Sequence, residues 1–202
     1  MFEEKDFKVF DVEGLDERMA EIRTLIQPKF QELDDYFAVE LGQELQLEFF
    51  VHIAQHRRRT TYPPENTWSA LSLKKRGYKM DPHFQLGIWP DYVFMWLSLI
   101  DNPKNEKRIV QAYLENQPLF QQLPDDFYVS MDHTVPKVEK LLDVDLEKAL
   151  TRFRDIKKGE FQIGRIISRD DPLLKEPNKA KAYMLTTYKE LIPLYKLALA
   201  QE

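Results

Sequence analysis

The chain has 202 residues, with 29 basic and 34 acidic side chains and a formal net charge of −5. Its composition, 43% hydrophobic and 31% charged, is typical of a folded soluble protein and excludes a largely disordered chain. The absence of cysteine excludes disulfides, a thiolate nucleophile and cysteine-based metal centres. We expect one α+β domain over residues 1–202 in the cytoplasm, because the acidic N-terminus shows no secretory signal and no apolar run is long enough to span a membrane.

The charges are distributed unevenly along the chain. Residues 1–51 carry 5 basic and 14 acidic side chains, whereas residues 52–83 carry 7 basic and 2 acidic ones. Three of the four histidines, His52, His56 and His83, fall in the basic segment. This asymmetry indicates an anionic partner or pairing between the two segments. A solvated loop with internal ion pairs explains the pattern about as well.

The first half of the chain changes from a helical to a strand pattern. Residues 7–12 are β-prone, and apolar residues at helical spacing predict helices over 14–26 and 28–42. From Leu45 to His56 the apolar residues alternate, which predicts a strand. Three further strands are expected over 68–73, 83–89 and 92–99, the last two joined by a turn at Pro90-Asp91. These strands form an antiparallel meander with loops over 57–66 and 74–82.

The second half is predicted to be mostly helical. The expected elements are a helix over 104–119, a strand over 127–131, a helix opening at Pro136, a strand over 161–167 and a long helix over 175–200 with a kink at Pro193. A strand, a helical stretch and a strand thus occur near residues 7–53 and again near residues 127–167, which hints at a degenerate β-α-β duplication. Because the strands cluster in the middle of the chain, the predicted class is α+β, with a central antiparallel meander packed with helices.

The alternation gives the meander two different faces. One face collects the aliphatic residues of an ordinary core. The other collects aromatic rings, histidines and a few polar groups, a mixture typical of ligand pockets. All three tryptophans, Trp68, Trp89 and Trp96, lie on this second face. Packing of the C-terminal helices over it would make it a second core instead.

Several segments of the sequence are unusual. The stretch HIAQHRRRTTYPPENTWSALS, followed by RGYKMDPHFQLGIW, is too peculiar for a generic strand-loop-strand unit. Together with FKVFDVEGLDERMAEIRTLIQPKF before it and DHT and GEFQIGR after it, it resembles the YktB-like family of uncharacterised bacterial proteins over most of the chain. The resemblance implies a single α+β domain without an assigned activity, and it supplies no catalytic residues.

The histidine spacing argues against a metal site. On a helix, His52 and His56 would lie close enough to share an ion, but on a strand the same spacing spans about 13 Å. Since the alternation predicts a strand, we expect no metal there. His83 or His133 would complete a site only through a fortuitous arrangement of the fold.

The cationic residues predict an anion pocket. Three consecutive arginines follow the first meander strand, and further cations precede His83. Guanidinium groups bind phosphate or carboxylate through two hydrogen bonds, and nearby aromatic rings stack on a planar ligand. Pairing of these arginines with the acidic first helices is an equally good explanation. The predicted ligand-binding residues are His52, His56, Arg57, Arg58, Asn66, Trp68, Arg76, Tyr78, Lys79, His83, Gln85, Trp89 and His133.

Three alternative functions remain. An enzyme would use a pocket histidine as general acid or base on a phosphorylated substrate, and Asp132-His133-Thr134 places a carboxylate beside one histidine. The GxSxG, HExxH, P-loop and GxGxxG motifs are absent, so neither catalytic residues nor a cofactor are indicated. Single-stranded RNA binding ranks lower because the sequence pI is near 5.5. A protein-interaction module would cover the aromatic face with a partner or a second copy, and the sequence leaves the oligomeric state open.

Overall fold

The computed structural model describes residues 1–100 and 103–201. The helices are α1 Glu4–Lys8, α2 Leu15–Glu21, α3 Gln27–Leu45, α4 Glu106–Glu115, α5 Pro118–Gln121, α6 Leu146–Asp155, α7 Pro177–Glu190 and α8 Ile192–Leu199. The strands are β1 Phe50–Ile53, β2 Thr67–Ser72, β3 His83–Ile88, β4 Tyr92–Leu99, β5 Tyr128–Ser130, β6 Glu139–Lys140 and β7 Phe161–Ser168. The predicted α+β class is confirmed.

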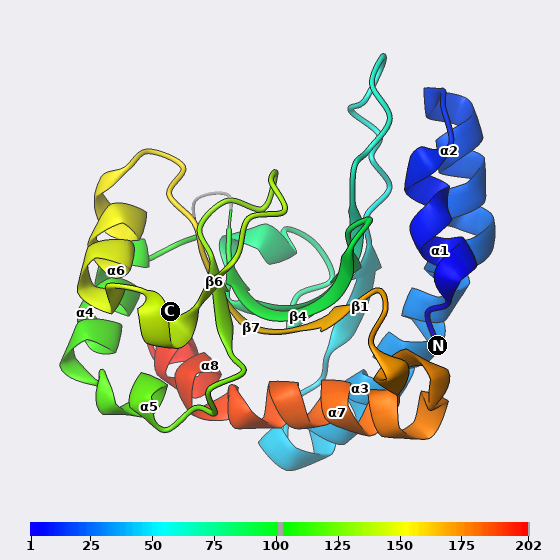
Figure 1. Ribbon diagram of the computed structural model, residues 1–202. Helices are drawn as coiled ribbons and strands as arrows, with labels where there is room; N and C mark the ends of the chain where they lie inside the picture. The colour runs from blue at the N-terminus through cyan, green and yellow to red at the C-terminus, as the bar shows by residue number, and fades with distance from the viewer. Residues whose placement is uncertain (101–102, 202) are drawn as a thin grey trace.

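The strands form one curved antiparallel sheet in the order β1-β2-β3-β4-β7-β5-β6. The meander β1 to β4 is therefore contiguous, as the sequence predicts, and the β3–β4 hairpin turns at Pro90-Asp91. Figure 1 shows the sheet as a trough, with α7 running below its convex face. The concave face opens on the other side, where the loops gather.

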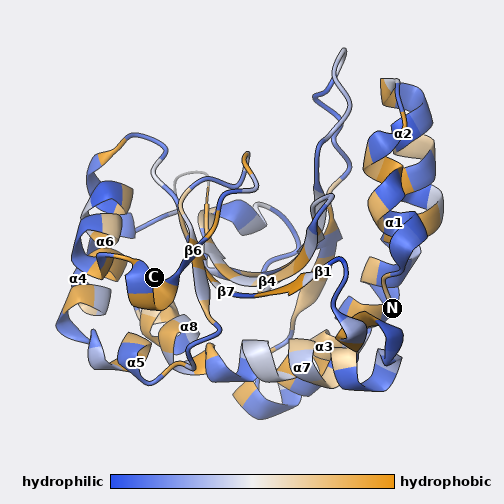
Figure 2. Cartoon of the chain, viewed as in Figure 1, coloured by the Kyte–Doolittle hydropathy of each residue, from blue (hydrophilic) through white to orange (hydrophobic). Residues whose placement is uncertain are grey.

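Helices bury the convex face of the sheet. α3 packs on β1 and β2, and α7 packs on β4 and β7. The main hydrophobic core lies between them and includes Phe37, Phe84 and Tyr188, whose rings are in contact. Figure 2 shows these helices carrying hydrophobic and hydrophilic residues in alternating stripes, as expected for helices with one buried face. Within the described residues, no helix combines the length and the apolar character that crossing a membrane requires.

The predicted strand over 7–12 is wrong. These residues continue from α1 into a 3₁₀ helix, Val9–Asp11, because a capping box starts the helix upstream. The Asp6 carboxylate accepts a hydrogen bond from the Glu3 backbone N–H at 2.6 Å. Without this strand, the N-terminal half of the hinted β-α-β duplication is not formed.

The two predicted N-terminal helices form one nearly continuous helical run, which extends further than expected. A π-helical turn, Ile22–Ile26, joins α2 to α3 just before Pro28, which has no N–H to donate to the preceding turn. α3 passes through Gly42 and ends only where Gln46 adopts a left-handed conformation, with φ 57°. The first meander strand is consequently much shorter than the alternation predicts.

The helix expected to open at Pro136 is also corrected. Residues 139–140 form the short edge strand β6, a 3₁₀ turn follows, and α6 begins at Leu146. The Asp145 side chain caps this helix by accepting from the Lys148 backbone N–H at 3.0 Å. The long C-terminal helix is divided into α7 and α8 at Leu191, two residues before Pro193. The predicted kink therefore lies at the expected place.

Candidate functional site

The cross-strand register decides which side chains share the concave face. Partner positions run from His52 through Ala70 and Gln85 to Trp96. Directly opposed residues of an antiparallel sheet point to the same side. The intervening positions contribute to the main core on the convex side. The two-face arrangement predicted from the alternation is therefore confirmed for the meander.

The centre of the concave face is packed rather than open. Its second hydrophobic cluster contains Trp89, Tyr92, Phe94 and Trp96, with Trp68, Tyr128, Val138 and Ile166 against it. The loop before β6 covers this cluster, and the Tyr92 hydroxyl donates to the Pro136 carbonyl at 2.8 Å. The cavity left beside the rings has a volume of only about 10 Å³, room for one water at most. This part of the predicted pocket lining is therefore a second core, closed by the 131–138 loop rather than by the C-terminal helices.

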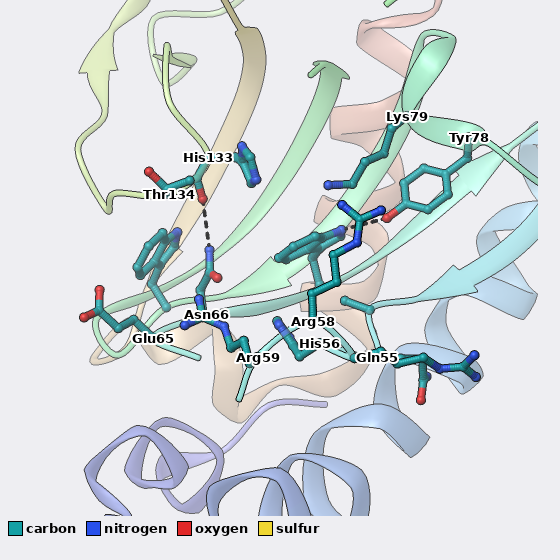
Figure 3. A pocket seen from close by; sticks show the side chains of 14 residues that line it. Gln55, His56, Arg58, Arg59, Glu65, Asn66, Tyr78, Lys79, His133 and Thr134 are labelled. Atoms are coloured by element: carbon teal, nitrogen blue, oxygen red, sulfur yellow. Dashed lines mark hydrogen bonds between the residues drawn. The ribbon is translucent and has the colours of Figure 1, made fainter. Parts of the chain in front are cut away.

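An open pocket lies at one end of this cluster, with a volume of about 520 Å³, within the range of small-molecule sites. It is formed by the connection between β1 and β2, by the 3₁₀ turn Tyr78–Met80 and by the loop after β5. Its lining residues are Ala54, Gln55, His56, Arg57, Arg58, Arg59, Glu65, Asn66, Trp68, Tyr78, Lys79, Trp89, His133 and Thr134. In Figure 3 the side chains of Arg58, Tyr78, Lys79 and His133 point toward a common space, whereas those of Gln55 and Glu65 point outward.

The structure brings most of the predicted site residues to this pocket. Those that line it are His56, Arg57, Arg58, Asn66, Trp68, Tyr78, Lys79, Trp89 and His133. The expectation that His52, Arg76, His83 and Gln85 share the same space is not met, because none of the four lines it. Gln85 instead faces the narrow cavity beside the second hydrophobic cluster.

Two of these residues, His83 and Gln85, form a hydrogen bond with each other inside the sheet. His83 is fully buried, and its Nδ1 donates to the Asp81 carbonyl at 2.8 Å. Its Nε2 is therefore an acceptor, and it receives the Gln85 side-chain amide at 3.0 Å. Burial lowers the pKa of His83 to about 4, so the ring is neutral at pH 7.

The other two residues lie outside the pocket. His52 stacks on Tyr78, with ring centroids 4.8 Å apart, and its Nε2 contacts the Lys74 carbonyl at 2.8 Å. Arg76 is exposed at the tip of the loop between β2 and β3. The alternation assigned His52 to the correct face, but its strand β1 lies at the edge of the sheet, and His52 is not among the residues that line the pocket.

Trp68 is the centre of the pocket. Its indole N–H donates to the Tyr78 hydroxyl at 3.2 Å. The rings of His56 and His133 approach it edge-on, with centroids 5.5 and 5.8 Å away. The ammonium of Lys79 lies 5.3 Å from the ring centroid, in a cation–π contact. These contacts come from three other segments of the chain, so the pocket is shaped by tertiary packing.

Positive charge lies on one side of Trp68. Arg58 and Lys79 extend to the same side of the pocket in Figure 3, close to the Tyr78 hydroxyl. Arg59 is turned toward its own loop, where it donates to the Tyr62 and Pro63 carbonyls at 3.3 and 3.4 Å. Within the part of the chain that the structure describes, no carboxylate forms an ion pair with Arg57 or Arg58. The acidic first helices therefore do not neutralise these two arginines.

His56 is held in an unusual backbone conformation beside Trp68. It has φ 48°, in the left-handed region, and its Nε2 contacts the Thr67 hydroxyl at 3.1 Å. Burial, together with the nearby charges of Arg59 and Lys79, lowers the pKa of His56 to about 4. A neutral ring at this position adds no positive charge at pH 7 to that of the arginines and the lysine in the pocket lining.

Glu160, a residue that the sequence reasoning missed, fixes the position of His133. One oxygen of its carboxylate accepts from the His133 backbone N–H at 2.7 Å, and the other contacts the ring Nδ1 at 2.6 Å. Glu160 is buried just before β7, whereas His133 follows β5, the strand that pairs with β7. No local pattern links two residues so far apart in the sequence, so only the strand pairing reveals them.

The same region contains the one group of metal-ligand types found among the described residues. The side chains of Asp132, His133 and Glu160 each offer a ligand atom, all within 4.8 Å of one another. These atoms already have partners, because Asp132 Oδ1 accepts from the Thr134 N–H and hydroxyl at 2.8 and 2.6 Å. The Nδ1 atom of His133 is likewise engaged by Glu160. The hydrogen bonds account for the cluster, and we assign no metal to it.

Comparison with known proteins places the chain in a family. It matches the family described as "Domain of unknown function (DUF1054)" over residues 2–195. A UPF0637 protein of Enterococcus faecalis is 72% identical over 201 residues, covering 100% of this chain and 99% of the relative. A UPF0637 protein of Lactococcus lactis subsp. cremoris is 46% identical, covering 97% of this chain and 98% of that protein. One from Oceanobacillus iheyensis is 44% identical, covering 98% and 96%.

These matches confirm the resemblance to a family of bacterial proteins. The names of the family and of these relatives state no activity. They extend over almost the full length of the chain and of its relatives, so they concern the chain as a whole and not a single motif. The chain belongs to the DUF1054 family.

Proposed function

We propose that the pocket around Trp68 binds a small anionic ligand that carries a phosphate or carboxylate group. The observation that supports this most directly is the presence of unneutralised positive charge at the opening of a pocket of suitable size. Arg58 has no ion-pair partner among the described residues, and it lies in the same lining as Lys79. A ligand anion would supply the missing counter-charge, with bidentate hydrogen bonds to the guanidinium group.

The remaining lining favours a ligand that also has a planar or apolar part. Trp68 and Trp89 provide aromatic surface at the inner end of the pocket. The side chain of Asn66 is fixed there, because its amide donates to the His133 carbonyl at 3.3 Å. Few polar groups at fixed positions, combined with aromatic walls, are typical of sites that orient a small molecule.

Calorimetric titration tests this proposal with inorganic phosphate, a nucleoside monophosphate, a sugar phosphate and a dicarboxylic acid as probes. At least one probe is expected to bind, and Arg58→Ala is expected to weaken that binding about tenfold or more, since a charge-assisted hydrogen bond contributes on the order of 1.5–3 kcal/mol. Raising the salt concentration should weaken binding further.

Arg76→Ala is the matched control. It removes the same charge from the neighbouring loop, outside the pocket, and should leave the affinity unchanged. Equal losses in both variants would show that general positive charge, rather than the pocket, attracts the anion. Absence of binding by every probe would contradict the proposal, as would retention of single-stranded RNA without any binding of small anions.

A further inference from the structure

The pairing of His133 with Glu160 determines which ring nitrogen of His133 carries the proton. An ionised carboxylate only accepts hydrogen bonds, so the contact at 2.6 Å makes Nδ1 of His133 the protonated nitrogen. The second carboxylate oxygen binds the backbone N–H of the same residue, which fixes both the ring and the main chain. In a neutral ring, Nε2 is then the basic nitrogen.

This basic nitrogen is available in the pocket. The His133 side chain is 23% exposed, and no hydrogen bond to its Nε2 is found within the described ranges 1–100 and 103–201. The ring lines the pocket beside Trp68, and Figure 3 shows it facing the side from which Lys79 extends. A proton acceptor held by a buried carboxylate therefore lies across the pocket from positive charge.

We propose that the pocket hydrolyses phosphate esters, with His133 as the general base and Glu160 as the residue that positions it. This proposal rests on the proposed anion binding and specifies its ligand. The proposed ligand carries either a phosphate or a carboxylate group. A phosphate group can be attached to the rest of the ligand through an ester bond that water can cleave, whereas a free carboxylate has no such bond. Arg58 and Lys79 would stabilise the negative charge of the phosphoryl group during transfer.

The reaction is a transfer of the phosphoryl group to water. The water oxygen forms a bond to phosphorus as the bond from phosphorus to the ester oxygen breaks, and the bonding electron pair leaves with that oxygen. The proton of the attacking water passes to Nε2 of His133, and from there to the departing alkoxide or to solvent. A monoester gives inorganic phosphate and an alcohol, and a diester gives a phosphate monoester and an alcohol. Glu160 stabilises the imidazolium that exists between the two proton transfers.

The test measures hydrolysis of p-nitrophenyl phosphate and bis(p-nitrophenyl) phosphate by the full chain in the presence of EDTA. Turnover of at least one ester is expected. His133→Gln should lower kcat about a hundredfold or more, as loss of a general base does. Glu160→Gln should lower kcat about tenfold with KM nearly unchanged, because a positioning residue affects the proton transfer and a merely structural role would not separate the two constants.

His52→Gln is the matched control, since it removes a histidine that lies outside the pocket. Titration with inorganic phosphate is carried out on each variant, and His133→Gln should retain phosphate binding. No turnover of either ester, or turnover unaffected by His133→Gln, would overturn this inference while leaving the anion pocket intact if phosphate still binds. Turnover abolished by EDTA and restored by a divalent metal would also overturn it, in favour of metal-dependent chemistry.

Discussion

The four histidines show how strongly the surroundings of a single residue decide its chemistry. His83 is fully buried and neutral, and His56 is made neutral by burial and adjacent cations. His52 stacks on a tyrosine outside the pocket. Only His133 combines a fixed ring with a nitrogen left available in the pocket. The residue type alone indicates none of these differences.

The buried ring of His83 should make stability depend on pH. Its folded-state pKa of about 4 lies below the unfolded value of about 6.5, so the unfolded chain binds more protons between these values. Acidification from pH 7.5 to 5.0 should therefore reduce the contribution of His83 to the free energy of unfolding by about 2 kcal/mol. Urea unfolding of the wild type and of His83→Gln at both pH values checks this.

The decisive quantity is the change in the free energy of unfolding between the two pH values. The absolute stability of His83→Gln is less informative, because this variant loses hydrogen bonds at every pH. The variant should lose about 2 kcal/mol less than the wild type on acidification. An identical pH dependence in both proteins would show that His83 is protonated as easily in the folded state as in the unfolded one.

At the scale of the strands, two glycines lie next to aromatic rings of the concave face. A Cβ at Gly87 would come within 2.0 Å of the Phe94 ring, and one at Gly164 within 2.8 Å of the Trp96 ring. Both glycines are register partners of the residue whose ring covers them. At Gly87 the missing side chain leaves room for the Phe94 ring, whereas at Gly164 a Cβ would first meet the Met95 carbonyl oxygen at 1.8 Å and then the Trp96 ring.

Gly87→Ala should therefore disturb the second hydrophobic cluster. The added methyl group forces the Phe94 ring away from the sheet, and overpacking of this kind costs about 1–3 kcal/mol in stability. Thermal unfolding measures the loss, and the near-ultraviolet circular dichroism of the packed tryptophans should change with it. A variant with wild-type stability and spectrum would mean that the ring moves without cost.

At the scale of the whole molecule, long-range ion pairs attach α1 to the remainder of the fold. Asp6 of α1 is fully buried and bonded to Lys29 of α3 at 2.5 Å. Glu4 of the same helix pairs with Arg169, just after β7. A helix as short as α1 is not stable alone, so these contacts and the adjacent core hold it in place.

Removing one partner of the buried pair should be strongly destabilising. Lys29→Met leaves the Asp6 carboxylate buried without its counter-ion, a change that costs about 3–5 kcal/mol. Chemical denaturation checks the value. Lys5→Met is the matched control, because the Lys5–Glu3 pair is exposed and its loss should have no measurable effect. Comparable losses of stability in both variants would contradict the prediction that the buried pair contributes more than the exposed one.

The sequence by itself determined the order of the strands in the meander. Alternation with a period of two and the hairpin turn at Pro90-Asp91 are both local properties of the chain. It also assigned the three tryptophans to one face of the sheet, but it left open whether the arginines after β1 face a pocket or pair with the acidic helices. It misjudged residues 7–12 and the end of α3, where a capping box and the left-handed Gln46 set helix boundaries that residue preferences do not indicate.

Only the tertiary structure decided which part of the aromatic face is open. The 131–138 loop packs over the central rings and leaves the pocket at the Trp68 end, and this depends on where a distant loop returns to the sheet. The same applies to Glu160, which meets His133 only because β5 pairs with β7. Side-chain alternation assigns a residue to a face, but the segment that covers that face comes from elsewhere in the chain, and its position is fixed by packing and strand pairing over long sequence separations.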